Sequence, residues 1–560
     1  MRPSISTIFH VLNKKLILAF FIAVQLINVL NAQTKSIVLG RPTNNSITAS
    51  VLFNQNVNFY FVYGTTSGVY TNTTSVYNNT ANTPDEIDFI NLNANTQYYY
   101  QLKYKLSSAS VYSTTPEYKF HTQRAPGNTF TFTVESDEHL YDKKGVKSMY
   151  EITLQNELND NPDFMLSLGD IFGDDHTATT ITTDSVKQLH LDYRPFLGNI
   201  AHSVPFYVCL GNHEGENDFY YSQNPPNNLC VFGTEWRKYY YPNPYPNNFY
   251  SGNTDVEPYG IGNPENYYAW TWGDALFVVL DVYRDECYTT LAAKPTNWNW
   301  TLGLPQYTWL KNTLENSTAT HKFVFAHHTR GQGRGGVKTA KGFEWGGYDG
   351  ANGTNYGFPA NRPGWAKPIH QLFVDNNVNI FFQGHDHLFA HEVLNNVTYQ
   401  EVPMPADSTY EIGMLANASA YESDTIVGTG HIRVTVSPLC VQVDFVRAYL
   451  PADTLSGLHQ NGEIAFSYFV GNNCVTSVEN KTEKTTTINF YPNPSNDILH
   501  ILMGNEVNNL LVKMYDVTGK LILQSTSKSI DIADVPNGVY QIQINAGTAL
   551  ETKKIIINHN

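Results

Sequence analysis

The sequence predicts a multidomain protein in which a central α/β core lies between two all-β domains, and three observations indicate this fold class. A chain of 560 residues is too long for one ordinary domain. Segments with strand-like alternation fill both ends of the chain, whereas strands and helical segments alternate in the middle. Hydrophobic residues make up 41% and aromatic residues 13% of the chain, which is enough for sizeable cores.

Residues 1–32 have the pattern of a signal peptide. Lys14 and Lys15 precede the short apolar run "LILAFFIAVQLINVLNA", which ends in the small residue Ala32. Polar residues interrupt the run, so it suits cleavage and export better than the alternative, a permanent N-terminal anchor. No later segment is long and apolar enough to span a membrane, and we therefore expect an exported mature chain without a transmembrane span.

Residues 36–123 are expected to form a β-sandwich of short strands separated by turns. In "NVNFYFVYG", Val57, Phe59 and Phe61 fall on one face of a strand. In "LNANTQYYYQLKYKL", Leu92 precedes Tyr98 at a spacing that resembles the fibronectin type III sandwich, where a Leu and a Tyr fix one corner. The segment "QRAPGNT" is a suitable domain boundary.

Residues 126–472 are expected to form the α/β core. "TFTFTVESDEH" and "DFMLSLGD" read as strands, and between them "KKGVKSMYEITLQNELND" places Val146, Met149 and Leu158 at roughly helical spacing. An insertion rich in Tyr, Asn and Pro, at roughly 215–265, is expected to be a long loop that shapes a rim or binding surface.

The C-terminal part begins with a polar linker, residues 473–486, which is rich in Thr and Lys. Residues 487–560 then contain the strand-like segments "DILHILM", "LLVKMYDVTGKLILQ", "NGVYQIQI" and "TKKIIIN". We expect a small β-sandwich.

The charge balance limits the classes of partner. The formal net charge is -15, and no run of Lys and Arg occurs beyond the N-terminus. A nucleic-acid groove is therefore not expected, because phosphate backbones need clustered cations. Small phosphate substrates remain compatible with this charge, since a bound metal supplies local positive charge.

Export permits disulfides, and the chain has five cysteines. Cys209 lies in the apolar run "VPFYVCL" and is expected to be a buried thiol. The expected pairs are Cys230 with Cys287 and Cys440 with Cys474, although the sequence leaves other connectivities open.

Acidic residues, amides and histidines follow the strands of the central region at the points where the strands end. They are Asp137 and His139 in "SDEH", Asp170 in "GD", Asn212 and His213 in "GNHE", His327 and His328 in "FVFAHH", and His385 and His387 in "GHDH". Strand ends of this kind form the usual ligand edge of an open α/β sheet. Taken singly, each segment is also consistent with ordinary turn chemistry.

Taken together, these side chains indicate a metal centre. Buried, unpaired charges are costly, and a cation offsets that cost by coordination. Carboxylate oxygens with imidazole nitrogens suit divalent Zn, Mn or Fe, and the absence of Cys from the set argues against a structural zinc site. A structural cluster without metal is the alternative.

In order along the chain, the five blocks resemble the signature of the calcineurin-like metallophosphoesterases, over about residues 128–470. The resemblance implies an α/β/β/α fold with two packed mixed sheets and two metals at the strand ends. It implies that Asp137, His139 and His387 bind one metal, that Asp170 bridges both, and that Asn212, His327 and His385 bind the second.

The same resemblance implies roles for residues that do not bind metal. His213 would face the substrate as an acid or phosphate contact, and catalysis would rest on His213 and Asp170. Arg330, Arg334 and His328 are expected substrate contacts, although solvated loop arginines are the alternative for the first two. Asp386, between His385 and His387, is expected to point aside as an outer or solvent-facing carboxylate, and His391 has no assigned role.

A fibronectin-like domain ahead of this core resembles the purple acid phosphatases, and implies acid phosphatase activity. Those enzymes carry a Tyr ligand in GDxxY, whereas "GDIFG" places Gly173 at that position. We therefore expect a similar architecture with a generic divalent pair. Asp174 or Asp175 could replace the Tyr, although each is out of register.

The C-terminal segments "FYPNPSNDIL", "VKMYDVTGKLI" and "VPNGVYQIQI" resemble the type A sorting domain of the bacterial type IX secretion system. The resemblance covers about residues 488–560. It implies the type IX machinery as a partner and a secreted or surface-attached enzyme. A carbohydrate- or protein-binding sandwich is the alternative.

The hypothesis from sequence is thus a secreted phosphoesterase with two divalent metals, which hydrolyses small phosphoesters by attack of a metal-bridging hydroxide. It would be a phosphatase or a phosphodiesterase. One alternative is a metal-binding surface or adhesive protein with a catalytically degenerate core. Another is a metallo-β-lactamase-like enzyme, but in "HDHLFAH" the Asp is misplaced for that family.

Overall fold

The computed structural model describes residues 35–142, 144–285, 297–329, 334–350, 352–411, 418–423, 425–471, 474, 489–502, 510–516, 520–546 and 549–559. The expected signal peptide, Cys287, Arg330 and nearly all of the expected linker lie outside these residues. The chain divides into two compact units, Met1–Cys474 and Val475–Asn560, which are described separately. Among the described residues, no helix combines the length and apolar character needed to cross a membrane.

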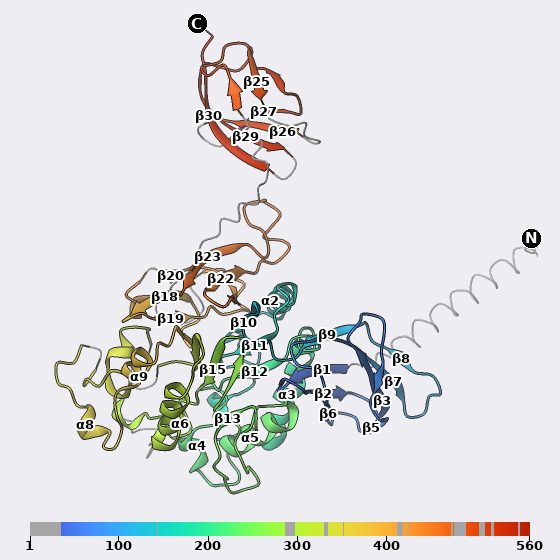
Figure 1. The fold of residues 1–560 in the computed structure, drawn as a ribbon, viewed down its shortest axis with the longest axis vertical. Helices are drawn as coiled ribbons and strands as arrows, with labels where there is room; N and C mark the ends of the chain where they lie inside the picture. The colour runs from blue at the N-terminus through green and yellow to red at the C-terminus, as the bar shows by residue number, and fades with distance from the viewer. Residues whose placement is uncertain are drawn as a thin grey trace, which may run out of the picture. The chain divides into compact units, whose positions relative to one another are not determined.

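Two sheets that share one hydrophobic core open the first unit (Figure 1). One sheet has the order β1-β2-β6, and the other has the order β4-β3-β7-β8, with β5 paired to β3 and β9 to β7. Val57, Phe59 and Phe61 are buried in this core, as the alternation in the sequence predicts. The strands are β1 (Lys35–Gly40), β2 (Ile47–Phe53), β3 (Val57–Gly64), β4 (Asn72–Thr73), β5 (Tyr77–Asn79), β6 (Asp85–Phe89), β7 (Gln97–Leu106), β8 (Ser113–Thr114) and β9 (Tyr118–His121).

Two larger mixed sheets form the centre of the first unit. The six-stranded sheet has the order β12-β11-β10-β21-β22-β23, and the eight-stranded sheet has the order β13-β14-β15-β16-β17-β19-β18-β20. The strands are β10 (Phe130–Glu135), β11 (Phe164–Ser167), β12 (Phe206–Val208), β13 (Ser251–Gly252), β14 (Tyr268–Trp272), β15 (Ala275–Val279), β16 (His321–Phe325), β17 (Ile380–Gln383), β18 (Phe389–Leu394), β19 (Val397–Glu401), β20 (Thr425–Ile426), β21 (Gly430–Val436), β22 (Val441–Arg447) and β23 (Ile464–Val470).

The two central sheets pack face to face through aromatic side chains. The ring of Phe132 on β10 lies 5.1 Å from that of Phe277 on β15 and 6.2 Å from those of Phe325 on β16 and Phe382 on β17. Apolar side chains at alternate positions of the strands in both sheets are buried in this interface. The prediction of a mixed α/β core is therefore confirmed.

Helices cover the outer faces of both central sheets. α2 and α3 pack on the six-stranded sheet, and α6 and α9 pack on the eight-stranded sheet. The helix expected after β10 is α2, in which Met149 is buried. The helices are α2 (Lys147–Asn159), α3 (Thr183–Leu197), α4 (Asp218–Tyr221), α5 (Leu229–Tyr240), α6 (Gly303–Glu315), α7 (Phe343–Gly346), α8 (Phe358–Asn361) and α9 (Ile369–Asp375), with 3-10 turns η1 (Asp175–Thr177), η2 (Asn297–Asn299), η3 (Thr339–Lys341) and η4 (Ala418–Ala420).

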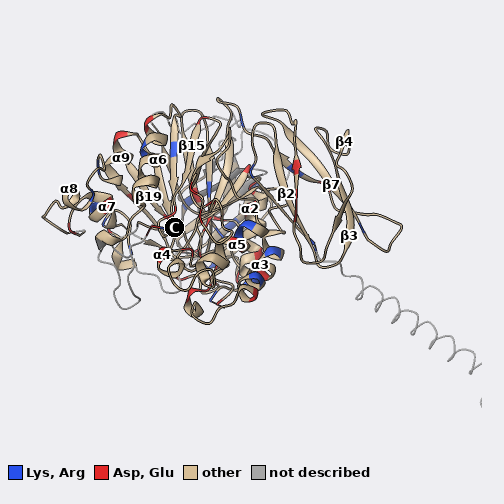
Figure 2. Cartoon of the chain, turned by 90° about the horizontal axis from the view of Figure 1, so that it is seen from below, with Lys and Arg blue, Asp and Glu red and all other residues tan. Residues whose placement is uncertain are grey.

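Charges of both signs occur on helices α3 and α5. Acidic and basic residues share α3 and α5 in Figure 2. In α3, for example, the half-buried Lys187 occurs with the exposed Asp184 and Asp192. The surface formed by these helices therefore carries no single sign of charge.

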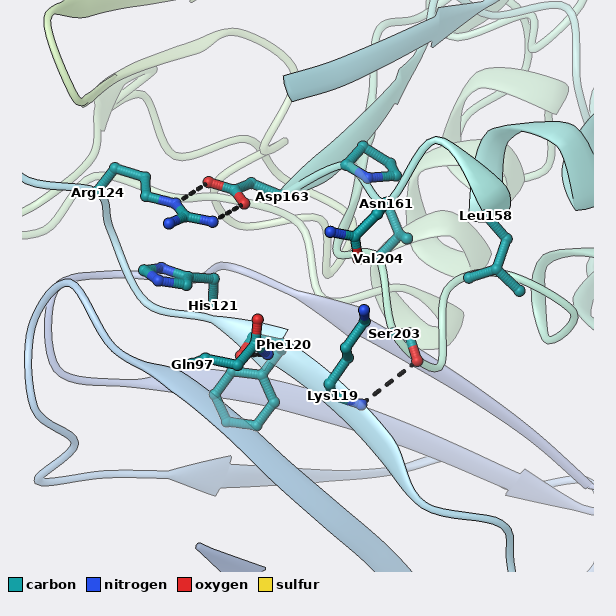
Figure 3. A pocket seen from close by; sticks show the side chains of 11 residues that line it. Gln97, Lys119, Phe120, His121, Arg124, Leu158, Asn161, Asp163, Ser203 and Val204 are labelled. Carbon is teal, nitrogen blue, oxygen red and sulfur yellow. Dashed lines mark hydrogen bonds and ion pairs between the residues drawn. The ribbon is translucent and has the colours of Figure 1, made fainter. Parts of the chain in front are cut away.

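The N-terminal sheets contact the central core around Arg124, at the boundary expected from "QRAPGNT". Arg124 forms a two-point ion pair with Asp163, with both nitrogen–oxygen distances below 3 Å (2.7 and 2.8 Å). The backbone N–H of Lys119 donates to Ser203 Oγ beside a small cavity of about 20 Å³ (Figure 3). The cavity is too small for a ligand larger than water, so this contact is structural.

The insertion at 215–265 is more ordered than the long loop expected from its composition. It contains α4, α5 and β13. Arg237 on α5 forms a buried two-point ion pair with Glu216, at 2.7 and 2.8 Å, and also donates to two backbone carbonyls. These contacts join the start of the insertion, α5 and the end of the insertion to one another, which its polar composition did not indicate.

The cysteine predictions have different outcomes. Cys440 and Cys474 form a disulfide, and Cys209 is a buried free thiol, as predicted. The predicted pair of Cys230 with Cys287 is wrong, because Cys230 is a buried free thiol. Cys230 lies on α5, where its sulfur accepts a hydrogen bond from Arg284. That contact places the thiol inside the core.

The second unit consists of two further sheets around one core. Their orders are β24-β25-β28 and β27-β26-β29-β30. The strands are β24 (Asn489–Tyr491), β25 (Ile498–Leu502), β26 (Leu510–Tyr515), β27 (Leu521–Ser525), β28 (Ser529–Asp531), β29 (Gly538–Ala546) and β30 (Ala549–Ile557).

We predict that Glu216→Ala destabilises the first unit by about 3–5 kcal/mol, because it leaves the guanidinium of Arg237 buried without its carboxylate. Urea unfolding followed by Trp fluorescence measures the change. Glu315→Ala, which removes the exposed ion pair with Lys311, is the control and should cost less than about 1 kcal/mol. Equal effects of the two substitutions would show that the buried pair does not hold the insertion.

Candidate metal centre

The candidate residues lie where parallel strands of the two central sheets end. β10, β11 and β12 are parallel neighbours in one sheet, and β15, β16 and β17 are parallel neighbours in the other. Their carboxyl ends therefore point the same way within each sheet, and the loops that follow bring the polar side chains together. Asp137 and His139 follow β10, Asp170 follows β11, Asn212 and His213 follow β12, His327 follows β16, and His385 and His387 follow β17.

The backbone turns sharply at most of these positions. Of the non-glycine residues with left-handed φ angles, five lie at these positions: Asp137 at 64°, His139 at 47°, Asp170 at 60°, His385 at 73° and His387 at 56°. Such conformations cost about 1–3 kcal/mol each and persist where the surroundings enforce them. Their concentration at one edge indicates that the loops are shaped for a site rather than for local stability.

One glycine allows the loop after β17 to approach the loop after β10. A Cβ added at Gly384 would lie 1.9 Å from Ser136 Oγ and 2.6 Å from Asp137 Oδ2. With no side chain there, the backbone N–H of His385 donates to Asp137 Oδ2 at 2.7 Å. The two sheets are thus joined directly at the site.

One group of potential ligands consists of Asp137, His139 and His387, whose ligand atoms lie within 4.8 Å of one another. His387 Nε2 is 3.3 Å from Asp137 Oδ1 and 3.0 Å from His139 Nε2. All three residues are buried.

A second group consists of Asp170, His327 and His385. His327 Nε2 is 3.3 Å from Asp170 Oδ2 and 3.2 Å from His385 Nδ1. Asp170 Oδ2 is also 3.8 Å from His139 Nε2, so its carboxylate lies between the two groups. The structure therefore brings six of the seven predicted ligand residues into two adjoining clusters.

The surroundings of these side chains fit divalent metal ions. Asp137 Oδ1 and Asn212 Oδ1 are buried and receive no hydrogen bond from any described residue. His327 Nδ1 lies 2.9 Å from the carbonyl oxygen of Leu168, which fixes its proton on that nitrogen and leaves Nε2 with a free lone pair. Oxygen and imidazole donors of this kind suit Zn, Mn or Fe.

The carboxylates and imidazoles also perturb one another electrostatically. Burial lowers the pKa of His327, but the charges of Asp170 and Asp137 raise it overall, to about 9. Burial likewise lowers the pKa of His139, while the neighbouring carboxylates of Asp137, 3.7 Å away, and Asp142, 3.4 Å away, raise it to about 10. Both rings therefore lie in a strongly negative environment, which favours any bound cation.

His213 lies beside the clusters without belonging to the six ligand residues. Its Nε2 is 3.6 Å from Asp170 Oδ2, and its backbone N–H donates to Asp170 Oδ1 at 2.9 Å. On the other side of the ring, Nδ1 lies 2.6 Å from Asp175 Oδ1. Burial lowers the pKa of His213, but Asp170 and Asp175 raise it above the ordinary value.

The sequence suggested Asp175 only as a substitute ligand, and its contact with His213 was not predicted. Asp175 is five residues beyond Asp170 in "GDIFGDD", a segment whose cluster of acids was the available signal. The contact depends on how η1 turns back toward the loop after β12, which the spacing of residues does not show.

Glu214 is the second residue whose role was missed. Its carboxylate accepts hydrogen bonds from the backbone N–H groups of Gly211 at 2.7 Å, Asp170 at 3.0 Å and Ile171 at 2.7 Å. A fourth comes from Phe172 at 3.3 Å. Glu214 therefore joins the loops after β11 and β12 and holds the backbone that carries Asp170.

Two of the expected substrate contacts, His328 and Arg334, have hydrogen-bonding partners within the protein. His328 is buried, its Nδ1 is 3.2 Å from the hydroxyl of Tyr283, and burial together with His327 lowers its pKa to about 3. Arg334 Nη1 donates to the carbonyl oxygen of His385 at 2.6 Å and to Asp386 Oδ1 at 2.9 Å. Arg334 thus braces the loop after β17, and its contact with substrate stays a prediction.

Asp386 turns away from the ligand groups, as expected of an outer carboxylate, but it does not face solvent. It is 1% exposed and accepts hydrogen bonds from Arg334, the backbone of Gly335 and the hydroxyl of Tyr421. His391 lies on β18, where its ring packs 4.1 Å from that of Tyr468, and takes no part in the site.

The structure gives a steric reason for glycine at position 173. A Cβ there would lie 1.9 Å from the carbonyl oxygen of His213 and 2.2 Å from the Cα of Glu214. These are backbone atoms and cannot move aside easily. A tyrosine ligand at this position is therefore incompatible with the arrangement of the His213 loop.

Two family models match the chain. Residues 130–389 match the model of the calcineurin-like phosphoesterases, and residues 489–558 match that of the secretion system C-terminal sorting domains. No curated protein sequence matches the chain. The two matches confirm both predicted resemblances, including the prediction that the chain is a phosphoesterase.

The solved structures that resemble this chain include PhoD and a plant purple acid phosphatase. PhoD has 16% sequence identity and a TM-score of 0.54, with 78% of this chain and 89% of that chain covered. The purple acid phosphatase PPD1 from yellow lupin (Lupinus luteus) seeds has 13% identity and a TM-score of 0.49, with coverage of 79% and 75%. At this identity, the likeness to PhoD concerns the fold alone.

We predict that Glu214→Gln destabilises the first unit by about 2–3 kcal/mol, because an amide group replaces one oxygen that accepts backbone N–H groups. The same variant should bind less divalent metal, because Asp170 is no longer held in place. Unfolding in urea and elemental analysis measure the two effects.

The matched control is Glu235→Gln on the exposed face of α5, which should change stability by less than about 0.5 kcal/mol. Wild-type stability and metal content in Glu214→Gln would show that the buried carboxylate does not position the Asp170 loop.

Proposed function

Because the chain carries a calcineurin-like phosphoesterase domain, we propose that it hydrolyses phosphate esters at a centre of two divalent metal ions. The observation that carries this proposal is the pair of adjoining ligand clusters with Asp170 between them. Two divalent ions held by these residues would activate water and neutralise the charge of the phosphate.

In the proposed assignment, one ion is held by Asp137, His139 and His387, and the other by Asn212, His327 and His385. Asp170 is shared between them. The geometry of the two clusters and the unpaired oxygen of Asn212 support this division. The mixed oxygen and nitrogen donors favour Zn, Mn or Fe.

His213 is proposed to donate a proton to the leaving oxygen of the ester. Its Nε2 faces Asp170, and Asp175 holds the opposite nitrogen. A carboxylate in this position orients the ring and stabilises its protonated form, so that Nε2 carries the proton toward the substrate. Hydrolysis of a phosphate monoester or diester breaks the P–O bond to an alcohol, and the oxygen of that departing alcohol requires such a proton.

The C-terminal sorting domain supports export of this enzyme. We propose that residues 489–558 direct the chain to the type IX secretion machinery after residues 1–32 have served as signal peptide. The fibronectin III-like domain proposed for residues 36–123 would then remain with the phosphoesterase in a secreted or surface-attached protein.

The alternative function, an adhesive surface protein with a degenerate core, is less well supported. Degeneration removes ligands or the groups that position them, whereas this chain keeps the ligand clusters, the acid at His213 and the carboxylate that orients it.

We predict that the purified protein contains about two divalent ions per chain and that Asp170→Asn binds fewer. Loss of the shared carboxylate should lower kcat for 4-nitrophenyl phosphate by about a thousandfold. Elemental analysis and steady-state kinetics test both parts. Less than half an ion per chain in an active preparation, or unchanged turnover by the variant, would contradict the two-metal proposal.

We predict that Asp175→Asn lowers kcat by about tenfold to a hundredfold while leaving the metal content unchanged, because it weakens only the acid. The loss should be larger for an alkyl phosphate than for 4-nitrophenyl phosphate, whose leaving group needs little protonation.

Asp174→Asn is the matched control, since Asp174 neighbours Asp175 but instead accepts a hydrogen bond from Thr177. Equal rates in the two variants, or equal losses on both substrates, would argue against a His213–Asp175 acid.

A further inference from the structure

A cavity of about 440 Å³ lies next to the metal centre and has no role in the mechanism above. Its walls are mainly apolar and aromatic, and come from the loop after β10, the loop after β11 and one face of α3. We call it the Tyr141 pocket, after the apolar and aromatic residues that line it: Leu140, Tyr141, Ile171, Leu189, Tyr193 and Phe196.

Residues that line the pocket directly adjoin residues of the metal centre. Leu140 and Tyr141 directly follow the ligand residue His139, and Ile171 directly follows Asp170. The hydroxyl of Tyr141 is 3.1 Å from His139 Nδ1, and its ring centroid is 5.9 Å from that of His213. The pocket therefore lies beside the residue proposed to protonate the leaving oxygen.

The pocket beside His213 lies where the alcohol part of a phosphate ester is expected in the proposed reaction. In the proposed reaction, water attacks phosphorus, the P–O bond to the alcohol breaks, and His213 gives its proton to the departing oxygen. The phosphate stays at the metals, so the alcohol extends from the phosphorus past His213. The side chain of Tyr141 forms the border between these two places.

The lining of the pocket indicates the kind of alcohol that it holds. Three aromatic rings and three aliphatic side chains form most of its surface, and rings of this kind favour stacked or edge contacts with another ring. Lys147 and Asp192, both exposed, are the charged lining residues, and Lys147 Nζ lies 5.8 Å from the ring centroid of Phe196. The volume is within the range of pockets that enclose small organic ligands.

We propose that the Tyr141 pocket binds the leaving group of the substrate and that the enzyme acts preferentially on phosphate esters of aromatic alcohols. This inference rests on the phosphoester hydrolysis proposed above, and it adds the class of substrate. A methyl or ethyl group would leave most of the pocket unfilled, whereas a fused aromatic ring has enough apolar surface to contact its walls.

The test uses the full metal-loaded protein and a variant that fills the pocket. Leu189 is half-buried on α3, and Leu189→Trp places an indole in the cavity without removing a core residue. The substrates are 2-naphthyl phosphate and phenyl phosphate, whose leaving groups have similar acidity, and methyl phosphate, which does not reach the pocket.

We expect wild-type kcat/KM for 2-naphthyl phosphate to exceed that for phenyl phosphate by about tenfold. Leu189→Trp should remove this preference and leave the hydrolysis of methyl phosphate within about twofold of wild type. A binding measurement should agree: 2-naphthylphosphonate, which is not hydrolysed, should bind about tenfold more weakly to Leu189→Trp by calorimetry, whereas methylphosphonate binding should not change.

A matched pair of variants controls for effects on α3. Leu189→Ala should lower kcat/KM for 2-naphthyl phosphate by several-fold, and Leu191→Ala should not, because Leu191 is half-buried on the same helix but does not line the pocket. Equal effects of Leu189→Trp on all three esters, or no preference for naphthyl in the wild type, would overturn the pocket assignment and leave the proposed hydrolysis standing. Hydrolysis of no phosphate ester by the metal-loaded wild type would overturn both.

Discussion

The carboxylates of Asp137 and Asp170 are buried where the ends of the central sheets meet. The rest of the site depends on the hydrogen-bond donors and positive charges that two buried carboxylates require. Hydrogen bonds satisfy one oxygen of each: Ser136 and the backbone of His385 donate to Asp137, and the backbone of His213 donates to Asp170. The remaining oxygens face imidazole rings. Burial of two like charges in one site is unfavourable without positive charge near them, and divalent ions would supply it.

The same constraint explains the shape of the loops. The paired carboxylates and imidazoles come from separate strands, so each loop must turn its side chain back over the sheet edge instead of continuing the strand. Left-handed backbone at five of these positions provides the turns, and the buried carboxylate of Glu214 supports one of them through four backbone N–H groups. Local strain is thus balanced by hydrogen bonds from neighbouring loops.

Helix α3 connects this site to the rest of the first unit. The buried Arg194 of α3 bonds to Ser36 and Ser50 in the N-terminal sheets, while Leu189 and Phe196 of the same helix line the Tyr141 pocket. One helix therefore both anchors the N-terminal sheets and forms a wall beside the metal centre. This dual role gives the N-terminal sheets a physical means to stabilise the region that is proposed to contact substrate.

The order of short motifs along the chain predicted the mixed α/β core and six side chains that the fold brings together in two clusters, because the motifs directly follow apolar strands and strand ends share one edge. The Cys440–Cys474 disulfide was also one of the pairings expected from the sequence. Three features depended on side chains that meet only in the folded protein: the carboxylate of Asp175 on His213, the backbone bonds of Glu214 and the burial of Cys230. Gly173 could be read from sequence as a missing tyrosine, but only the approach of the His213 backbone shows that no side chain fits there. The spacing of residues in the sequence shows which side chains follow a strand. Contacts between separate loops depend on how the sheets pack, and that packing brought Asp175 to His213, brought Glu214 to the Asp170 loop and formed the Tyr141 pocket.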